Sequence, residues 1–436
     1  MNGYRDLRVA LLGCGSVGAQ TARLILEHGE ELAARIGARL TLAGIAVRDV
    51  NAKRDVELPQ ELFTTDAERL VQSADIVIEL MGGIEPARTL ILQALQGGAD
   101  VVTANKALIA EHGRELADAA EQVGAQLSYE AAVAAAIPIL RPLRESLAGD
   151  HITRVLGIVN GSTNYILDRM DRFGDSAEDA MRVAAELGYL EADPTLDVEG
   201  FDAAQKATIL ASIAFHTEMP VDAVHREGIS NITLAQIEAA KHAGYVIKLL
   251  AIAERITSSD GVAGVSARVY PALIRRDHPL AAVYGGKNAV FVEAEAAGEL
   301  MFYGAGAGGA ETASAVLGDL VSAARRHVIG GPGIPGSLHA ELPILPVGEV
   351  NTAYQVMLDV HDQPGVLAGI AGILAEHGVS AASVEQTVAK EQEGRAALVI
   401  GTHVAREADL AAMVDALRSS DLVLEVTSVL RLEGNA

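Results

Sequence analysis

Cysteine is almost absent from this chain of 436 residues, which carries Cys14 alone. A single cysteine excludes an intramolecular disulfide and leaves no cysteine cluster for a structural zinc, and it fits a reducing compartment. Basic residues are also scarce, with 34 Lys and Arg against 58 Asp and Glu and a formal net charge of -24. Nucleic acids and anionic membranes are bound through basic patches, so we expect neither as a partner.

Long hydrophobic runs are missing as well. No stretch approaches the ~18 apolar residues that a membrane span needs. The chain starts with MNGYRDLRVALL, which has neither a long apolar core nor a cleavage-site pattern. We therefore expect a cytoplasmic protein. Half of the residues are hydrophobic, so a chain of this length can bury more than one core, and two or three domains are expected.

The first motif is typical of dinucleotide binding. A short apolar run at residues 7–12 enters Gly13-Cys14-Gly15-Ser16-Val17-Gly18, and a helical pattern follows. This strand, turn and helix context raises GxGxxG above a chance match, because the glycines let the backbone approach a pyrophosphate at the helix N-terminus. Taken alone, the motif is weak, since glycine turns join strands to helices in many folds.

The end of the next expected strand, residues 39–47, bears on the choice of cofactor. Arg48 follows it, with Lys53 and Arg54 just beyond. An NAD-specific site would place a carboxylate where Arg48 lies, so the basic residues favour the 2′-phosphate of NADP. Asp49 lies next to Arg48 and keeps NAD as the other candidate.

Further strands are expected at residues 75–80, 100–103 and 126–129, with helical stretches such as 107–122 between them. This alternation predicts an α/β fold with a Rossmann-type, doubly wound parallel sheet. Ligands of such sheets bind at the carboxyl ends of the strands, where Thr103 and Lys106 lie. The alternative for Lys106 is a solvated lysine in the first turn of a helix, although the helix dipole disfavours a cation there.

The most informative segment, residues 186–210, gathers carboxylates around one lysine. The acidic residues are Glu191, Asp193, Asp197, Glu199 and Asp202. Lys206 follows Asp202 by four residues, which puts the two on one face of a helix. The residues around Lys206 are small or apolar, and a lysine that loses hydration at the edge of a packed helix is suited to donate a proton. The alternative is an ordinary exposed pair of opposite charges.

A second glycine-rich turn, residues 304–309, opens a helix rich in small residues. Its placement suggests that the backbone at Gly306 and Gly308 lies against the cofactor. A flexible loop is the commoner use of clustered glycine and remains the alternative. The chain between the two glycine turns reads as a mixture of strands, such as 152–159, and helices, such as 203–214.

The C-terminal part follows a glycine- and proline-rich stretch, residues 330–336, which is typical of a linker. Beyond residue 351 the pattern predicts strand, helix, strand, strand, helix and strand. That βαββαβ order is typical of a ferredoxin-like module.

The chain resembles homoserine dehydrogenases. The matching stretches are GCGSVG from Gly13, VVTANKALIA from Val101, YEAAVAAAIPIL from Tyr129, NGSTNYIL from Asn160, the segment 186–210, and FYGAGAGGAETASAVLGDL from Phe302. They are spread over residues 1–335. The resemblance implies an NADP-linked enzyme, with NAD as the second candidate cofactor, that interconverts L-aspartate 4-semialdehyde and L-homoserine in threonine and methionine biosynthesis.

The resemblance also implies the domain organisation. The NAD(P)-binding Rossmann domain would span residues 1–135 and be completed by about 303–335. Residues 136–302 would form an α+β catalytic and dimerisation domain, and 330–350 a linker. Residues 351–436 would form the C-terminal domain. A homodimer or homotetramer is expected.

Roles for individual residues follow from the same resemblance. Lys206 would donate the proton to the carbonyl oxygen, Asp202 would orient Lys206 or balance its charge, and Lys106 would lie near the nicotinamide and the reacting oxygen. The substrate-binding residues would be Glu191 and Asp197 for the ammonium group, and Asn160, Gly161 and Thr163 for the carboxylate or the cofactor ribose. A zwitterionic amino-aldehyde needs anionic groups, donors and a proton source of this kind. The alternative for residues 160–163 is a polar turn.

A loop in the family binds a monovalent cation such as Na⁺ through backbone oxygens. The matching positions are Glu130, Val133, Ala135 and Ile137. Backbone carbonyls suit a hard, weakly held cation. Relatives often carry glycine where this chain has Ala135 or Ala136, and the methyl groups restrict the loop geometry.

The stretch DQPGVLAGIAGILAEHGVS, which begins at Asp362, resembles the ACT domain, a regulatory amino-acid-binding unit. An effector would bind at Asp362, Pro364, Gly365 and Val366, and threonine is the expected effector. Some such modules only mediate dimerisation, because fold alone does not establish a ligand. For the whole chain, two alternatives remain: a catalytically silent nucleotide or amino-acid sensor, and a dehydrogenase for another amino-aldehyde.

Overall fold

The computed structural model describes residues 5–190, 193–330, 340–388 and 394–434. The chain folds into two compact units, each built from three separate stretches of sequence. Unit 1 comprises Met1–Gly161, Gln205–Asp222 and Lys287–Glu341, and unit 2 comprises Ser162–Ala204, Ala223–Gly286 and Leu342–Ala436.

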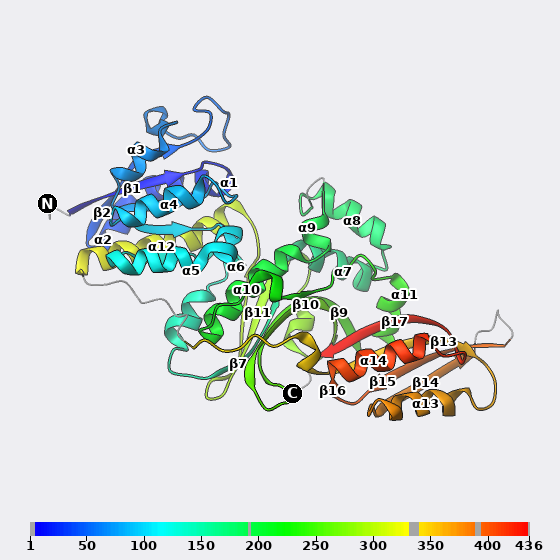
Figure 1. Ribbon diagram of the computed structural model, residues 1–436. Helices are drawn as coiled ribbons and strands as arrows, with labels where there is room; N and C mark the ends of the chain where they lie inside the picture. Colours follow the sequence, from blue (N-terminus) through cyan, green and yellow to red (C-terminus); the bar gives the residue numbers. More distant parts are fainter. Residues whose placement is uncertain (1–4, 191–192, 331–339, 389–393, 435–436) are drawn as a thin grey trace. The chain divides into compact units, whose positions relative to one another are not determined.

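Unit 1 contains a parallel sheet with the strand order β3-β2-β1-β4-β5-β6 (Figure 1). Its strands are β1 (Arg5–Leu12), β2 (Ala38–Ala46), β3 (Phe63–Thr64), β4 (Ile76–Glu79), β5 (Asp100–Thr103) and β6 (Leu127–Ser128). The order reverses between β1 and β4, which makes the carboxyl ends of these two strands the place where such sheets bind ligands. The prediction of a doubly wound parallel sheet is confirmed.

Helices cover this sheet, and one of them comes from far along the chain. The helices are α1 (Ser16–Glu27), α2 (Gly29–Ile36), α3 (Ala67–Gln72), α4 (Ala87–Gln96), α5 (Lys106–Val123), α6 (Ala131–Ala134) and α12 (Gly309–Ile329). Helix α12, yellow in Figure 1, packs against α1. It buries Ala313, Val316, Leu320 and Ala323 completely, so the hydrophobic core of the sheet depends on a segment some 300 residues after β1.

Unit 1 also holds a second, antiparallel set of strands. They are β7 (Ile152–Ile158), β11 (Lys287–Ala294) and β12 (Gly298–Ala305), with β11 between the other two. Most of helix α10 (Phe201–Phe215), which carries Lys206, belongs to the same unit. The end of β7 leads directly to Val159 and Asn160.

Unit 2 has one sheet that runs from the middle of the chain to its C-terminal part, in the order β9-β10-β17-β13-β15-β14. Its main strands are β9 (Tyr245–Thr257), β10 (Ala263–Arg275), β13 (Asn351–His361), β14 (Ala381–Val388), β15 (Arg395–Thr402) and β17 (Val423–Glu433); the short β8 (His225–Arg226) and β16 (Ala405–Arg406) pair with β10 and β13. The helices are α7 (Gly161–Phe173), α8 (Ala177–Glu186), α9 (Thr195–Val198), α11 (Leu234–His242), α13 (Val366–Glu376) and α14 (Glu407–Arg418).

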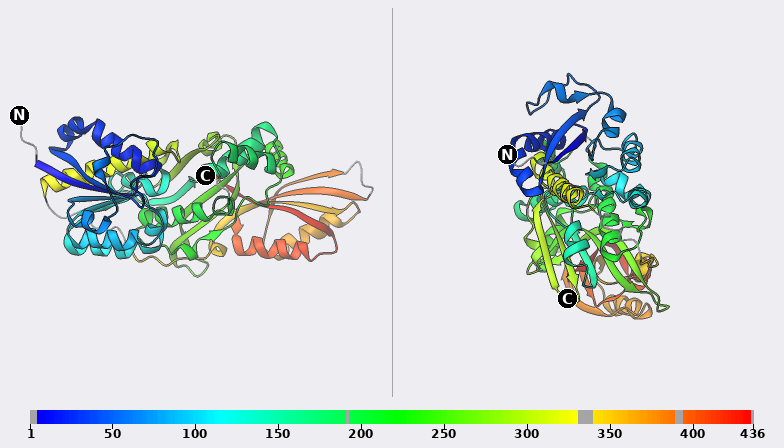
Figure 2. Two further views of the ribbon diagram at one scale, coloured as in Figure 1. Left: turned by 90° about the horizontal axis from the view of Figure 1, so that it is seen from above. Right: turned by 90° about the vertical axis from the view of Figure 1, so that its left-hand side faces the viewer.

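The C-terminal module has the βαββαβ order that the sequence predicts. Helices α13 and α14 lie on one face of its strands, as the left view of Figure 2 shows. The apolar side chains between the helices and the strands include Val356, Leu358, Ile370, Leu410 and Leu417, each at most 2 % exposed. The ferredoxin-like prediction is confirmed.

The sequence does not indicate how tightly this module is joined to the rest of unit 2. The last strand, β17, pairs in parallel with β10 through Ala272–Ile274 and Arg431–Glu433. Residues 331–339 of the expected linker lie outside the described part of the chain. Beyond them, the Val265 N–H donates to the Pro343 oxygen (2.9 Å), and the Leu345 N–H donates to the Val265 oxygen (2.8 Å). The described end of the linker is therefore held against β10.

Candidate functional site

The first glycine turn connects β1 to α1 at the sheet's reversal point. Gly13 has φ +97°, and a Cβ atom there would lie 2.6 Å from the Leu80 oxygen; a Cβ on Gly18 would lie 2.3 Å from the Gly13 oxygen. Both positions therefore require glycine. At Gly15, no described atom lies within 4 Å of an added Cβ, so a ligand can approach the main chain there. Helix α1 starts with no side-chain cap and no acidic residue in its first turn among the described residues, which suits a pyrophosphate.

The loop after β2 carries the residues expected to choose between NADP and NAD. Arg48 is exposed two residues beyond the end of β2. Arg54 folds back across the loop and donates to the main-chain oxygens of Ala52 (2.7 Å) and Asp49 (2.9 Å). Its guanidinium lies over the Phe63 ring, 4.1 Å from the centroid. Arg54 thus closes the loop, a role that the sequence did not reveal, and leaves Arg48 at the surface.

Cys14 lies inside the glycine turn and is partly buried. Burial raises the pKa of its thiol, and the Arg54 guanidinium opposes that shift. A thiol with a raised pKa stays protonated near neutral pH and behaves as a small apolar side chain.

The second glycine turn lies against the first. A Cβ atom on Gly309, the first residue of α12, would lie 2.5 Å from the Ser16 hydroxyl, and Gly308 has φ +130°. An added Cβ on Gly306 would overlap the Asn288 side chain at 2.1 Å. The turn that contains Gly306 and Gly308 is therefore tightly packed rather than a loose loop, and it meets the start of α1.

Asn288 was missed in the sequence analysis. It is fully buried on β11, and neither polar atom of its amide has a hydrogen-bond partner among the described residues. Buried amides without partners are rare and costly. Because the amide lies beside Gly306, it fits a site in which a bound cofactor or an ordered water completes the hydrogen bonds.

Lys106 is positioned by a buried network at the carboxyl ends of β4 and β5. Thr103 donates to Glu79 Oε2 (2.6 Å), and the other Glu79 oxygen accepts from the Met81 N–H (2.7 Å). Asn105 donates to the Gly83 oxygen (2.6 Å) and accepts from the Leu108 N–H, which caps α5. Lys106 is the first residue of α5, so this network fixes where its side chain begins. Glu79 was not among the residues predicted for the site.

Lys206 lies on α10 and is 8 % exposed, as is Asp202 one turn earlier. The alternative of an ordinary exposed ion pair is therefore wrong. Lys206 Nζ donates to the main-chain oxygen of Val159 (2.7 Å). Val159 precedes Asn160, which is 5 % exposed. The structure thus joins two separate predicted segments, the acidic stretch and the NGST stretch, through a buried lysine.

The remaining predicted substrate residues are distributed around these elements. Gly161 opens α7, so residues 160–163 start a helix rather than form a polar turn, and Thr163 is 1 % exposed. Asp197 is half-buried in α9. Glu191 lies outside the described residues, between Leu190 and Asp193.

The loop predicted to bind a cation is anchored by its own first residue. The Glu130 carboxylate accepts the N–H groups of Ile139 (2.5 Å), Leu140 (2.7 Å) and Arg141 (2.8 Å). Between Glu130 and Ile139, Ala135 has φ +47°. This conformation costs free energy for a residue with a Cβ. Val133 and Ile137 are buried in the same loop.

Asp319 ties this loop to α12, one of the helices that cover the parallel sheet. Its carboxylate accepts the Glu130 N–H (2.8 Å) and pairs with Arg141 (2.6 Å). Burial raises the pKa of Asp319 to about 6, against the opposing effects of the Glu130 N–H and Arg141. No three His, Cys, Asp or Glu side chains come together as a metal site in the described chain, so a cation here would depend on main-chain oxygens.

The predicted effector turn begins α13. Gly365 has φ +99° and precedes Val366, the first helical residue. Asp362 and Pro364 are exposed, and Val366 is buried. The described part of α13 has no side-chain cap and no acidic residue in its first turn, which leaves its start open to a carboxylate.

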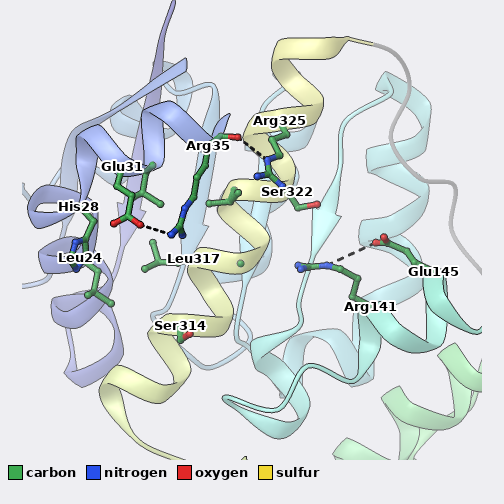
Figure 3. Close-up of a pocket in the computed structure, with 13 residues that line it drawn as sticks. Leu24, His28, Glu31, Arg35, Arg141, Glu145, Ser314, Leu317, Ser322 and Arg325 are labelled. Carbon is green, nitrogen blue, oxygen red and sulfur yellow. Dashed lines mark hydrogen bonds and ion pairs between the residues drawn. The ribbon is translucent and has the colours of Figure 1, made fainter. Parts of the chain in front are cut away.

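The groove in Figure 3 is distinct from these residues. It has a volume of about 740 Å³ and lies between α1, α2 and α12. Its cations have partners: Arg35 pairs with Glu31, Arg325 donates to the Arg35 oxygen (3.1 Å), and Arg141 pairs with Glu145 (3.9 Å). None of the predicted site residues lines it. Separately, no helix in the described ranges is long and apolar enough to span a membrane.

Comparisons with known proteins agree on one family. The family model described as homoserine dehydrogenase matches residues 138–321, its NAD-binding domain matches 13–130, and the ACT domain matches 354–421. A homoserine dehydrogenase of Corynebacterium glutamicum is 54 % identical over 427 residues, which cover 98 % of this chain and 95 % of that protein.

Solved structures give the same result. The homoserine dehydrogenase of Thiobacillus denitrificans has a TM-score of 0.91 and 39 % identity, with 99 % of each chain covered. A hyperthermophilic archaeal homoserine dehydrogenase mutant in complex with NADPH has a TM-score of 0.63 and 28 % identity, covering 75 % of this chain and 99 % of the other.

Proposed function

Because the chain belongs to the homoserine dehydrogenase family and is an NAD(P)-dependent oxidoreductase, we propose that it interconverts L-aspartate 4-semialdehyde and L-homoserine with NADP as its preferred cofactor. The observation that carries the proposal is the buried Lys206, whose amine is held at the Val159 oxygen beside Asn160. A lysine ammonium group is a hydrogen-bond donor only, so a lysine oriented in this way is suited to a carbonyl oxygen of the substrate.

Lys206 is the proton donor for the reduction. A bound nicotinamide cofactor supplies the hydride to the carbonyl carbon. The carbonyl oxygen then takes a proton from Lys206 Nζ, which becomes a neutral amine and is reprotonated from solvent. In the reverse direction the neutral amine removes the hydroxyl proton of homoserine. The Val159 oxygen orients the amine in both directions, and Asp202 lies one helical turn away on the same helix.

Lys106 supplies a second cation close to the glycine turns. The network of Glu79, Thr103 and Asn105 places it at the first position of α5. At this end of the sheet its ammonium group would stabilise negative charge on the reacting oxygen.

The substrate is a zwitterion, and the two sets of polar residues match its two ends. Glu191 and Asp197 hold the ammonium group, while Asn160, Gly161 and Thr163 donate to the carboxylate. Charge-assisted hydrogen bonds of this type are the strong ones, so they fix the orientation of the amino acid.

Selection of NADP is assigned to Arg48. Its support is the exposed position just beyond β2, at the start of the loop that Arg54 closes. A guanidinium at this place pairs with a 2′-phosphate, whereas NAD offers only a hydroxyl.

A monovalent cation such as Na⁺ is proposed for the loop of Glu130, Val133, Ala135 and Ile137. The support is the positive φ of Ala135 and the anchoring of the loop by Glu130. Main-chain oxygens of such a loop would suit a hard cation of low charge.

The ACT domain is assigned to feedback regulation by threonine, in an assembly of two or four chains. One support is the start of α13 after Gly365, which has no side-chain cap. The other is the pairing of β17 with β10, which connects the module directly to the rest of unit 2. We retain residues 1–135, completed by about 303–335, as the nucleotide-binding domain, 136–302 as the catalytic domain and 351–436 as the ACT domain.

Glu191 offers a clear test of the proposed substrate. Glu191→Gln should raise the Michaelis constant for homoserine by roughly tenfold or more, since a charge-assisted hydrogen bond to the ammonium is lost, and should leave that for NADP unchanged. The matched control is Glu186→Gln, because Glu186 belongs to the same acidic segment but is an exposed partner of Arg182. Equal Michaelis constants in both variants would contradict the assignment.

A further inference from the structure

A cleft of about 350 Å³ in unit 1 lies between α5 and α10. Its walls come from the middle of α5, from the second half of α10 and from residues 218–222 that follow α10, together with Tyr129 and Arg144. We call it the α5–α10 cleft. None of the residues predicted for substrate, cofactor or cation lines it, and its volume is in the range of small-molecule sites.

Arg144 supplies a cation to this cleft. It donates to the Tyr129 hydroxyl, and its guanidinium lies over the same ring, 4.5 Å from the centroid. Its Nε is buried without a hydrogen-bond partner, and no carboxylate in the described part of the chain forms an ion pair with Arg144. A guanidinium carries five N–H donors in one plane. Arg144 therefore retains donors for an acceptor that the described residues do not supply.

The position of Arg144 is fixed by its own segment of chain. Arg144 belongs to a short π-helical turn, Pro142–Ser146. The residues just before this turn donate their N–H groups to the buried Glu130 carboxylate, over 2.7 Å from Leu140 and 2.8 Å from Arg141. Turns of this wide kind are rare and are frequently found at functional sites. The guanidinium is thus held against the Tyr129 ring by an anchored turn.

Thr208 supplies a second polar group to the cleft. It is 2 % exposed on α10, and its hydroxyl has no hydrogen-bond partner among the described residues. A threonine inside a helix commonly donates to the carbonyl of the preceding turn. A buried hydroxyl without any partner costs free energy. A ligand that accepts a hydrogen bond from Thr208 would remove that cost.

The rest of the cleft is apolar inside and acidic at its rim. The apolar side chains are each at most 6 % exposed and comprise Ile109, Ile209, Ile213 and Met219. The acidic residues are exposed and comprise Glu111, Glu218 and Asp222. Glu218 already pairs with Arg114 of α5 over 3.3 Å, and exposed charges of this kind are weakened by water and salt. The interior therefore offers one cation, one hydroxyl and an apolar wall.

We propose that the α5–α10 cleft binds a small aliphatic carboxylate, whose oxygens accept from Arg144 and Thr208 and whose alkyl chain packs on the isoleucine side chains. The planar guanidinium matches the two oxygens of a carboxylate, and the apolar wall favours an alkyl chain over water. Thr208 follows Lys206 by two residues on α10. Side chains two positions apart do not share a helix face, so the cleft is distinct from the site of the proposed proton donor, and binding there does not depend on the proposed function.

Calorimetric titration of the full-length chain with butanoate tests the proposal. The titration is run without other ligands and again with NADPH and L-homoserine, a pair that cannot react. We expect butanoate to bind in both cases, and Arg144→Met to weaken its binding by about tenfold or more, since a charge-assisted hydrogen bond is lost. The matched control is Arg114→Met, which removes a cation from the rim of the same cleft and should change the affinity little.

A second variant covers the case in which Arg144→Met fails to fold. Thr208→Val removes the hydroxyl and nearly keeps the shape, so it should weaken butanoate binding. It should not lower the melting temperature of the ligand-free protein, because the lost hydroxyl has no partner there. A lower melting temperature would show that the hydroxyl is bonded within the fold and would overturn the proposal. So would the absence of butanoate binding, its loss with NADPH and homoserine present, wild-type affinity in Arg144→Met or Thr208→Val, or equally tight binding of inorganic phosphate.

Discussion

Lys206 Nζ donates a hydrogen bond to the main-chain oxygen of Val159 over 2.7 Å. The contact places the amine at the carboxyl end of β7, next to the start of α7, although the two residues are 47 positions apart in the chain. The sequence suggests only that Lys206 is buried. The contact with Val159 also fixes the direction of its side chain.

Lys206→Ala should lower turnover by roughly 100-fold or more, because positioned proton donors are typically worth that factor or more, and should leave cofactor binding nearly intact. The matched control is Lys241→Ala, since Lys241 Nζ also donates to a main-chain oxygen, that of Asp171 (3.0 Å), but is exposed on α11. Steady-state kinetics and cofactor titration measure both quantities. Wild-type turnover in Lys206→Ala would show that Lys206 is not the proton donor.

Arg48→Ala should raise the Michaelis constant for NADP by roughly tenfold or more and change that for NAD little, since only NADP carries a phosphate at that place. Arg39 lies at the opposite end of β2 and pairs with Asp6 and Glu30 at the surface. Arg39→Ala therefore serves as the control and should affect neither cofactor. Equal changes for NADP and NAD would show that Arg48 does not read the phosphate.

Asp319 predicts a pH dependence of stability. Its folded pKa of about 6 lies above the ~3.9 of an unfolded aspartate. The folded state therefore binds more protons between pH ~4 and ~6, and its stabilising contribution, full below pH ~4, is lost as the pH rises through ~6, at no more than about 1.4 kcal/mol per pH unit. Asp319→Asn removes this term. Urea unfolding from pH 4 to 7 should show wild type losing stability relative to the variant over that window.

The exposed Asp118 supplies the control for that measurement, because Asp118→Asn changes a surface carboxylate of the same unit. Its unfolding curve should run parallel to that of wild type. If the curve of Asp319→Asn also runs parallel, the carboxyl of Asp319 is not protonated in this range.

The helices and strands could be predicted from the sequence more fully than the contacts between them. The strand and glycine turn at residues 7–18 could be predicted because strands and helices each have a characteristic period of hydrophobic residues. A single sequence shows these periods. Helix α12 was predicted from its glycine start, but its packing on α1 depends on residues some 300 positions apart.

The supporting residues of the site could not be predicted for a similar reason. Glu79 and Asn288 lie within ordinary strands, and their roles arise from neighbours in space. Strand β17 pairs with β10, although the sequence pattern of neither segment indicates that it lacks a partner strand.

Gly365→Asp should abolish inhibition by threonine while leaving basal activity unchanged. The substitution places a carboxylate, at φ +99°, before the uncapped start of α13, where it would repel the carboxylate of an effector. Gly372→Asp is the control, because Gly372 lies on the same helix and no described atom lies within 4 Å of an added Cβ. Inhibition curves with millimolar threonine measure the effect. A full-length enzyme indifferent to threonine would make dimerisation the better account of this domain.

Deletion of residues 351–436 should destabilise the rest of unit 2. Strand β10 would lose its partner β17, and the fully buried Arg268 would lose Glu433 (3.6 Å) and keep Glu254 (2.6 Å). An exposed strand edge also promotes aggregation. Thermal unfolding and light scattering of the truncated chain check this. A truncated protein with the melting temperature of the full-length chain would show that the module is only loosely attached.

The central claim is tested most directly by following the absorbance of the reduced nicotinamide when the purified chain is mixed with L-homoserine and either NADP or NAD. The account predicts that reduced cofactor appears with homoserine, at a higher specificity for NADP than for NAD, and that Lys206→Ala suppresses it. No reduced cofactor with either nucleotide, or equal rates with an unrelated amino alcohol, would contradict it.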